Sequence, residues 1–279
     1  MKLYVAGNVR QAESDKIDYD NGTRNRLLSY AFIEDWADLA FKFWVENNPA
    51  SASVFLDSGA YSAKTRGTAI DLDKYCDYIH EHKDALAAYA VLDVIGDWKA
   101  TAVNQARMEA RGLSPVPCFH RGEPWGVLDE MASRGGYVAI GGLVTAGQFS
   151  QDALQPYLDQ LFDRLAKHWP VRVHLFGMSS QWILERYPLY SADSASAIMG
   201  AGMGRVQRFV SGQMVSRGWV EDLAETWDGV VADGVGRVGE NSDSAHAGRR
   251  RRNIEATLRL EQHGTDLWTR RGVTWEAGA

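Results

Sequence analysis

Short apolar runs recur along the chain, and most are followed by a small or polar residue. Seven of them are rich in β-branched or aromatic residues and predict buried strands, at residues 3–7, 53–59, 87–94, 115–120, 137–143, 171–177 and 189–195. Between several of these runs, apolar residues recur every third and fourth position and predict helices, at residues 72–86, 98–112, 151–169 and 179–187. Strands that alternate with helices in this way are parallel, so the pattern predicts an α/β fold, a (β/α)8 TIM-like barrel.

The eighth strand and the C-terminal segment are the least regular parts of the pattern. Residues 204–210 are the candidate for the eighth strand, although the glycines around them also suit an irregular loop. Residues 234–252 predict a loop, and residues 252–272 predict a helix that can bury Ile254, Leu258, Leu260 and Leu267. We therefore expect a barrel within residues 1–235 and a basic loop and helix, residues 236–279, packed on it.

Composition excludes several classes of protein. The 279 residues are 45% hydrophobic and 24% charged, values typical of a globular protein with a full core. Neither an apolar run of about 18 residues nor a signal-peptide pattern is present, so a cytoplasmic protein is expected. Cys76 and Cys118 are the only cysteines and show no C-x-x-C spacing, which supports neither a cysteine-rich zinc site nor a disulfide framework.

Charge is unevenly distributed. Within a total of −6, seven arginines against three acidic residues leave residues 247–275 at +4 and the rest of the chain at −10. A basic segment on an acidic body is typical either of an edge that binds a polyanion or of a solvated helix face. On the first interpretation Arg249, Arg250, Arg251 and Arg252 would bind nucleic acid.

Polar residues stand where the predicted strands end. The carboxyl ends of parallel barrel strands open into one mouth, which is where active sites of this fold lie. Asp57, Asp93 and Asp193 occupy such positions, together with His120, Gly141, Gly142 and Gly177. A single aspartate there often caps a helix, but three at one level raise each other's pKa unless a substrate or cation offsets them. The acids suit either double-displacement glycosyl transfer or a magnesium site.

Neighbouring residues suit a flat ligand. Ser58 and Gly59 let the backbone approach closely, and Tyr61 and Phe176 offer aromatic faces for stacking. Backbone N–H groups at Gly141 and Gly142 would meet a carbonyl oxygen, although a tight turn explains the pair equally. His120, expected to be neutral near pH 7, is either a hydrogen-bond donor or an interior residue, and His174, in mid-strand, is interpreted as structural.

In this order, the segments resemble the tRNA-guanine transglycosylase superfamily over about residues 50–200. DSGAYS at 57–62 resembles the segment whose Asp acts in proton transfer and base binding and whose aromatic residue stacks on the base, which implicates Asp57 and Tyr61. LDV at 92–94, AIGGL at 139–143 and HLFGM at 174–178 are similar to base-binding segments and implicate Asp93, Gly141, Gly142 and Phe176. YSADSAS at 190–196 takes the place of the nucleophile segment, so Asp193 would attack C1′ of the sugar.

Departures from that pattern point to one branch. The superfamily members that act on tRNA carry a C-x-C-x-x-C…H zinc module after the nucleophile, whereas this chain has no cysteine after Cys118. CFHRGE at 118–123 stands where a glutamine is usual, so His120 is the nearest equivalent. The short form without zinc resembles the phage-type DNA deazaguanine transglycosylases, the DpdA-like branch, and a phage protein of this kind would act in the host cytoplasm.

The resemblance implies retaining base exchange without a metal or other cofactor. Guanine in DNA, single-stranded or flipped out of a duplex, would be replaced by a free 7-deazaguanine such as preQ0 through a covalent Asp193 intermediate. The alternatives left open are a tRNA substrate, a deazaguanine nucleoside hydrolase, a non-catalytic partner subunit and a metal-dependent barrel hydrolase. A homodimer is compatible with each of these.

Overall fold

Eight parallel strands form the centre of the molecule. A computed structural model describes residues 1–7, 14–33, 38–143, 150–217, 243–273 and 275. The strand order is β4-β3-β2-β1-β8-β7-β6-β5. An isolated parallel bridge between Ala90 and Val116 joins the two ends of this order, and the Val91 N–H donates to the Val116 carbonyl at 3.0 Å. The sheet therefore curls round on itself as in a TIM barrel, which confirms the predicted fold class at this level.

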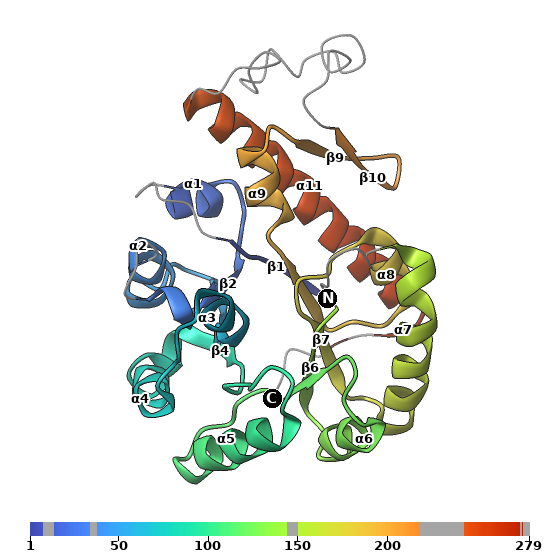
Figure 1. Ribbon diagram of the computed structural model, residues 1–279. Coiled ribbons are helices and arrows are strands. Elements are labelled where there is room, and N and C mark those ends of the chain that lie inside the picture. The colour runs from blue at the N-terminus through green and yellow to red at the C-terminus, as the bar shows by residue number, and fades with distance from the viewer. Residues whose placement is uncertain (8–13, 34–37, 144–149, 218–242, 274, 276–279) are drawn as a thin grey trace.

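The strands are short, and helices follow most of them. The strands are β1 Lys2–Val5, β2 Asn25–Ser29, β3 Ser53–Asp57, β4 Leu86–Tyr89, β5 Cys118–His120, β6 Tyr137–Gly141, β7 Arg172–Leu175 and β8 Ser191–Ser194. The helices are α1 Ser14–Asp20, α2 Asp38–Phe41, α3 Ala60–Arg66, α4 Leu72–His82, α5 Trp98–Ala110, α6 Trp125–Ser133, α7 Gln151–Leu165, α8 Gln181–Arg186, α9 Ser196–Gly202 and α11 Asp243–Arg270. Single helical turns lie at Tyr30–Phe32, Lys42–Glu46, Lys83–Ala85 and Ala166–His168. Figure 1 shows the helices in a ring around the strands.

The predicted strands are all present except the eighth. The remaining strand of the barrel is β2, which was not predicted and pairs in parallel with β1 and β3. Its sequence, NRLLS, conceals it because Arg26, its second residue, interrupts the apolar run. Arg26 is fully buried, its Nε lies 3.0 Å from Asp15 Oδ1, and its Nη1 donates to the Val5 carbonyl at 2.7 Å. A paired and hydrogen-bonded arginine thus replaces the apolar residue that the pattern expects.

Residues 204–210 form no barrel strand, so the predicted eighth strand is wrong. Val206–Val210 is β9, which pairs in antiparallel fashion with β10, Gln213–Arg217. The hairpin lies beside α11, as Figure 1 shows, and the Gln207 N–H donates to Asn253 Oδ1 at 2.6 Å. Gly212, with a φ of 79°, occupies the turn, a conformation that glycine adopts without strain.

Helix α11 begins earlier than predicted. Residues 234–242 lie outside the described residues, but Asp243 to Arg252, expected to be part of a loop, belong to the helix. At its C-terminal part the Trp268 Nε1–H donates to the Leu184 carbonyl in α8 at 2.7 Å, and near its start Arg250 pairs with Asp18 of α1. Between them, Glu261 accepts from the Leu3 N–H of β1 at 2.8 Å. The helix thus lies between α8 and α1 and covers the outside of the barrel beside β1.

Aromatic rings pack against one another in the barrel interior. Phe55 lies 5.7 Å from Tyr4, 4.7 Å from His174 and 5.7 Å from Phe176 between ring centroids. Leucine-rich faces of the outer helices, such as Leu154, Leu158, Leu161 and Leu165 of α7, pack on the outer face of the sheet. In the described part of the chain, no helix has the length and apolar character to cross a membrane.

Candidate active site

Six consecutive strands of the barrel carry the predicted site residues at their carboxyl ends. Asp57 closes β3, Asp93 follows β4, and His120 closes β5. Gly141 closes β6, Phe176 and Gly177 follow β7, and Asp193 lies in β8. Because parallel strands bring their carboxyl ends to one edge, these residues line one mouth. The three aspartates are near enough to interact, since the charges of Asp93 and Asp193 both act on Asp57.

Asp193 is held in a fixed orientation. It is 5% exposed, and its Oδ1 accepts from the Gly177 N–H at 2.7 Å and lies 3.3 Å from His174 Nε2. Gly177 has a φ of 68°, the left-handed region in which a residue with a Cβ is strained, so a glycine suits the position from which this N–H points at the carboxylate. Among the described residues, no hydrogen-bond donor is assigned to Oδ2. One oxygen is therefore anchored and the other is open for bonding to a ligand.

Asp57 is a buried carboxyl group whose acidity is altered by its surroundings. Burial, together with the nearby charges of Asp93 and Asp193, raises the pKa of Asp57 to about 7. The Gly59 N–H donates to its Oδ2 at 3.0 Å and opposes this rise. A side chain on Gly59 would lie 2.5 Å from the Ala31 Cβ, so the turn requires glycine. A carboxyl group with this pKa exchanges protons readily at neutral pH.

Asp93 and His120 form a pair on the side of the mouth opposite Asp193. Asp93 Oδ2 lies 3.0 Å from His120 Nε2, and its Oδ1 accepts from the Ser58 hydroxyl at 2.8 Å. Burial alone would lower the pKa of His120, but the Cys118 sulfur and hydrogen bonds to Asp93, Cys118 and Glu123 outweigh burial and raise it. The prediction of a neutral imidazole near pH 7 is therefore wrong, because sequence spacing does not reveal the acids that surround it.

The glycine pair at the end of β6 leaves space beside His120. A Cβ on Gly141 would lie 2.7 Å from His120 Cδ2 and 3.4 Å from Cys118 Sγ. Gly142 has a φ of 70°, and a Cβ there would lie 3.2 Å from the Arg121 backbone nitrogen. The Gly141 carbonyl accepts from the Arg121 N–H at 3.1 Å. Close approach of the β5 and β6 ends thus requires both glycines, whatever they bind.

The two predicted stacking residues differ in position. Phe176 is partly buried, 4.6 Å from the His174 ring and 5.7 Å from the Phe55 ring. Tyr61, in the first turn of α3, is 65% exposed, and no ring contact or hydrogen bond ties its side chain to the rest of the described residues. The structure brings Phe176 into the mouth and leaves Tyr61 accessible to solvent.

The predicted arginine quartet is not a single binding surface, which corrects that interpretation. Arg249 is 3% exposed and its Nε donates to the Ala201 carbonyl at 3.0 Å. Arg250 is 2% exposed, and its Nε lies 2.6 Å from Asp18 Oδ1. Both guanidinium groups therefore hold α11 on the barrel. Arg251 is exposed, and Arg252 is half-buried with Nη1 3.2 Å from Glu255 Oε2.

His174, whose place in mid-strand predicts a structural residue, lies beside Asp193 at this site. Its ring is fully buried, its Nδ1 lies 2.6 Å from Ser191 Oγ, and the Ser191 hydroxyl in turn contacts the Tyr137 hydroxyl. A buried polar chain of Tyr137, Ser191 and His174 thus ends at Asp193. The alternation of strand residues could have revealed it, because His174 and Phe176 face the same side of β7.

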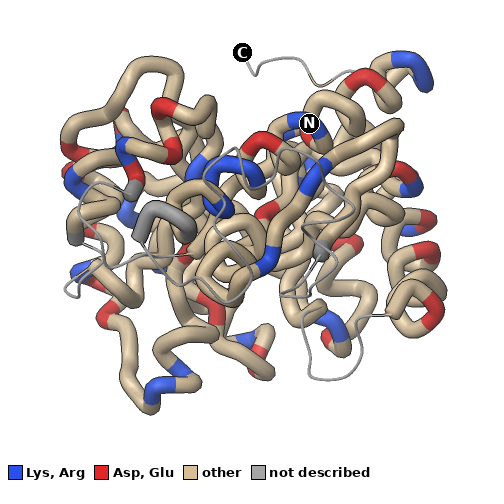
Figure 2. The backbone as a smooth tube through the Cα atoms, turned by 90° about the horizontal axis from the view of Figure 1, so that it is seen from above, with Lys and Arg blue, Asp and Glu red and all other residues tan. Residues whose placement is uncertain are grey.

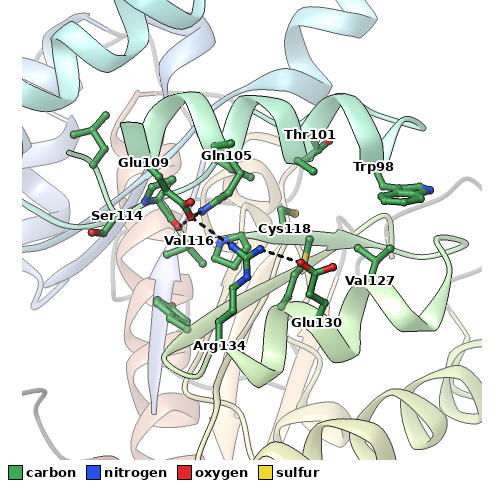
Figure 3. A pocket seen from close by; sticks show the side chains of 18 of the residues that line it. Trp98, Thr101, Gln105, Glu109, Ser114, Val116, Cys118, Val127, Glu130 and Arg134 are labelled. Atoms are coloured by element: carbon green, nitrogen blue, oxygen red, sulfur yellow. Dashed lines mark hydrogen bonds and ion pairs between the residues drawn. The ribbon is translucent and has the colours of Figure 1, made fainter. Parts of the chain in front are cut away.

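A cavity of about 480 Å³ lies outside the mouth, between α5 and α6. Figure 3 shows Arg134 between Glu109 and Glu130 at this cavity, with Val116, Cys118 and Val127 near them. Asp57, Asp93 and Asp193 do not line it. We therefore base the candidate site on the carboxylates and not on this cavity.

Charge on the backbone trace is dispersed. Figure 2 shows Lys and Arg, and Asp and Glu, distributed over many elements of the described chain. A cavity of about 290 Å³ between β9 and α11 is lined by Arg208, Arg252 and Arg259, together with Glu255. Basic residues of α11 and of the β9–β10 hairpin meet at this cavity.

Comparisons with known proteins assign no family. No protein-family model matches the chain, and no curated protein matches it in sequence. Among solved structures, the carboxyl transferase domain of Rhizobium etli pyruvate carboxylase, determined with 3-hydroxypyruvate, matches with a TM-score of 0.47 and 9% identity. The match covers 95% of this chain and 47% of that one, so this chain spans about half the length of the structure it matches. We draw no functional argument from similarity at this level.

Proposed function

We propose that the protein is a DNA-guanine transglycosylase that exchanges guanine in DNA for a free 7-deazaguanine base. The observation that carries the proposal is the pair of unlike carboxyl groups in one mouth. Asp193 is oriented by an N–H group and leaves one oxygen open, whereas the pKa of Asp57 is raised to about 7 by burial and by Asp93 and Asp193. Two carboxyl groups held in different environments are what retaining glycosyl transfer requires.

In the first half of the proposed reaction, the Asp193 carboxylate attacks C1′ of the deoxyribose. The C1′–N9 bond breaks, an ester forms between Asp193 and C1′, and guanine leaves with the proton that Asp57 supplies. Protonated Asp57 is well populated near neutral pH because of its raised pKa. The Gly177 N–H keeps the carboxylate of Asp193 in place while its other oxygen forms the new bond.

In the second half, the incoming 7-deazaguanine occupies the same pocket and loses its N9 proton to Asp57. N9 attacks C1′, the ester bond to Asp193 breaks, and both carboxyl groups return to their starting states. Atoms, charge and protons balance without an oxidant or a nucleotide cofactor. Two inversions at C1′ retain the configuration of the sugar.

Base recognition in this proposal uses the remaining residues of the mouth. Asp93 and Ser58, joined by a hydrogen bond of 2.8 Å, would accept from the N–H edge of guanine, with His120 beside them. Phe176 would stack on one face of the base, and exposed Tyr61 would cover the other. The backbone at Gly59, Gly141, Gly142 and Gly177 would bound a flat ligand without side-chain obstruction.

The choice of DNA as the substrate is the most specific part of the proposal. A stacked base cannot present C1′ to an aspartate inside a barrel mouth, so the target must be single-stranded or flipped out. Phosphate contacts would come from arginines that are not fully buried, with Arg208, Arg252 and Arg259 at the β9–α11 cavity as candidates, because Arg249 and Arg250 are buried. Support for DNA over tRNA comes from the sequence resemblance alone.

The test is incubation of the protein with preQ0 and, separately, single-stranded DNA, duplex DNA and tRNA, followed by digestion and mass spectrometry of the nucleosides. We expect deazaguanine deoxynucleoside with single-stranded DNA and less with duplex. Incorporation only into tRNA would contradict the DNA assignment. Abasic sites with free guanine and no incorporation would show a hydrolase, and no reaction with any of the three would refute the transglycosylase proposal.

A further inference from the structure

Asp93, Cys118 and His120 lie on the same side of the mouth and carry three different metal-binding groups. Within the described part of the chain, they form a cluster whose ligand atoms all lie within 4.8 Å of one another. Nε2 of His120 is 3.0 Å from Asp93 Oδ2 and 3.7 Å from Cys118 Sγ. We propose that these three side chains bind one zinc ion.

The spacing suits a tetrahedral ion. Zinc bonds of about 2.3 Å to sulfur and about 2.0–2.2 Å to nitrogen and oxygen set neighbouring ligand atoms about 3.3–3.6 Å apart. The two distances measured from His120 Nε2 bracket that range. The third separation, between the ligand atoms of Asp93 and Cys118, is no more than 4.8 Å, and side-chain rotation would have to bring it into that range.

Strand alternation explains why two of the ligands face the same way. Cys118 and His120 are two residues apart in β5, so their side chains lie on the same face. Between them, Phe119 faces the opposite side, where its ring stacks on Trp125 of α6 with centroids 5.8 Å apart. Asp93 arrives from the neighbouring segment after β4, across the bridge that closes the barrel.

The groups around the cluster are those that orient metal ligands. Nδ1 of His120, the ring nitrogen that does not face the cluster, lies 3.4 Å from Glu123 Oε1. Glu123 also accepts from the His120 backbone N–H at 3.1 Å. Asp93 is held through Oδ1 by Ser58, which leaves Oδ2 for the ion. Carboxylates and hydroxyls in such positions fix the ring and the carboxylate of a metal site.

Donor type selects the metal. A thiolate and an imidazole favour zinc, whereas magnesium prefers oxygen ligands alone. Three protein ligands leave one tetrahedral position for water or for a polar atom of a substrate. Gly141 keeps the side of the cluster at β6 open, since a Cβ there would lie 2.9 Å from His120 Nε2.

This inference is independent of base exchange, because binding is measured without substrate. If exchange also occurs, Asp93 and His120 would act on the base through the ion and not directly. The absence of a cysteine-rich motif, which led the sequence to predict no metal, does not bear on a three-ligand site of mixed donors.

The experiment uses tag-free, reduced, full-length protein stripped of metal and titrated with Zn²⁺ by calorimetry and with Co²⁺ by absorption. Co²⁺ reports the cysteine directly, because thiolate ligation gives an intense near-ultraviolet charge-transfer band. We expect one Zn²⁺ per chain, a thiolate band with Co²⁺, and no competition from Mg²⁺. Cys76→Ser is the matched control, since Cys76 is the other buried free cysteine and lies in α4.

Cys118→Ser should lose the Co²⁺ thiolate band, while Cys76→Ser should keep the band and the affinity. Glu123→Gln keeps all three ligands and should weaken Zn²⁺ binding about 10- to 100-fold. Weak or substoichiometric Zn²⁺ binding by the wild-type protein, or an unchanged band in Cys118→Ser, would overturn the inference. If Cys118→Ser does not fold, the wild-type thiolate band and its retention in Cys76→Ser still decide it, since only two cysteines are present.

Discussion

The mouth of the barrel holds two aspartate–histidine pairs that are similar in spacing and different in surroundings. On one side, Asp193 Oδ1 lies 3.3 Å from His174 Nε2, and on the other, Asp93 Oδ2 lies 3.0 Å from His120 Nε2. Behind His174 stand the hydroxyl groups of Ser191 and Tyr137 and the rings of Phe55 and Phe176. His120 is instead flanked by the Cys118 sulfur and the Glu123 carboxylate.

The difference indicates different tasks for the two pairs. A histidine held by neutral hydroxyls and aromatic rings can orient one carboxylate, and Asp193 keeps a second oxygen for a ligand. A histidine among a thiol and two carboxylates is surrounded by groups that bind a cation. We therefore expect changes in the Asp193 pair to affect the chemical step, and changes in the Asp93 pair to affect binding.

The sharpest test of that division compares Asp193→Asn with Asp93→Asn. Removing the proposed nucleophile should lower the rate of exchange at least about 10³-fold and abolish the covalent DNA adduct, because no ester can form. Asp93→Asn should act mainly on KM for the base and leave a trappable adduct. Gel shift after denaturation and nucleoside mass spectrometry measure the two effects.

The matched control is Asp20→Asn, since Asp20 lies on the exposed side of α1 in a pair with Lys16. It should behave as wild type in both assays. Equal adduct formation by Asp193→Asn and wild type would remove Asp193 from the chemistry, and loss of the adduct in both Asp193→Asn and Asp93→Asn would abolish the distinction between the pairs.

Asp57→Asn should lower the exchange rate by about 10²- to 10⁴-fold, the usual contribution of a general acid or base. In the wild-type enzyme the proposed first step requires protonated Asp57. Since its pKa is about 7, exchange should decline as pH rises above that value. A pH profile of single-turnover exchange checks this, and an alkaline limb that persists in Asp57→Asn would assign the titration to another group.

The same substitution changes how stability depends on pH. The pKa of Asp57 rises from 3.8 to about 7 on folding, so between these values the native state holds a proton that the unfolded state has released. Its contribution to the free energy of unfolding is complete below pH 4 and is lost as pH rises through 7. Relative to wild type, the free energy of unfolding of Asp57→Asn should therefore rise by about 2–4 kcal/mol between pH 4 and pH 8. Urea denaturation at both pH values measures this gain.

How far the sequence predicts the molecule can be seen in particular residues. Strand ends at Asp57, His120 and Gly141 follow from apolar runs, and barrel geometry then brings them together. β2 escaped prediction because one of its buried residues, Arg26, is charged, and only the fold shows Asp15 and the Val5 carbonyl that satisfy it. The local pattern thus identifies elements that bury apolar side chains and misses an element that buries a charged side chain together with its partner.

The sequence pattern likewise does not reveal interactions between residues that are far apart in the chain. Arg250 was predicted to bind nucleic acid, but Asp18, 232 positions away, neutralises it inside the protein. Asp93, Cys118 and His120 show no motif, since one ligand precedes the crossover helix α5 and two follow it. The acids that raise the pKa of His120 were individually visible, but their proximity to it was not.

Substitutions of His174 test whether this residue positions Asp193 or binds the substrate. His174→Gln can still reach Asp193 with its amide nitrogen, whereas His174→Asn retains only the shorter reach toward Ser191. We expect His174→Asn to lower kcat about 10- to 100-fold with little change in KM, and His174→Gln to recover part of that loss. A larger change in KM than in kcat would place His174 in substrate binding, contrary to the comparison.

Tyr137→Phe is the mildest change, because Tyr137 contacts Asp193 only through Ser191 and His174. Removal of its hydroxyl leaves Ser191 bonded to His174, so the expected loss is about 1 kcal/mol of stability and less than about 5-fold in kcat. The substitution should leave Zn²⁺ affinity unchanged, since Tyr137 is not among the groups around Asp93, Cys118 and His120. Thermal unfolding, single-turnover exchange and Zn²⁺ calorimetry on one preparation test all three statements. A change in Zn²⁺ affinity would show that the two pairs are coupled through the β6 strand, and they would then have to be treated as one site.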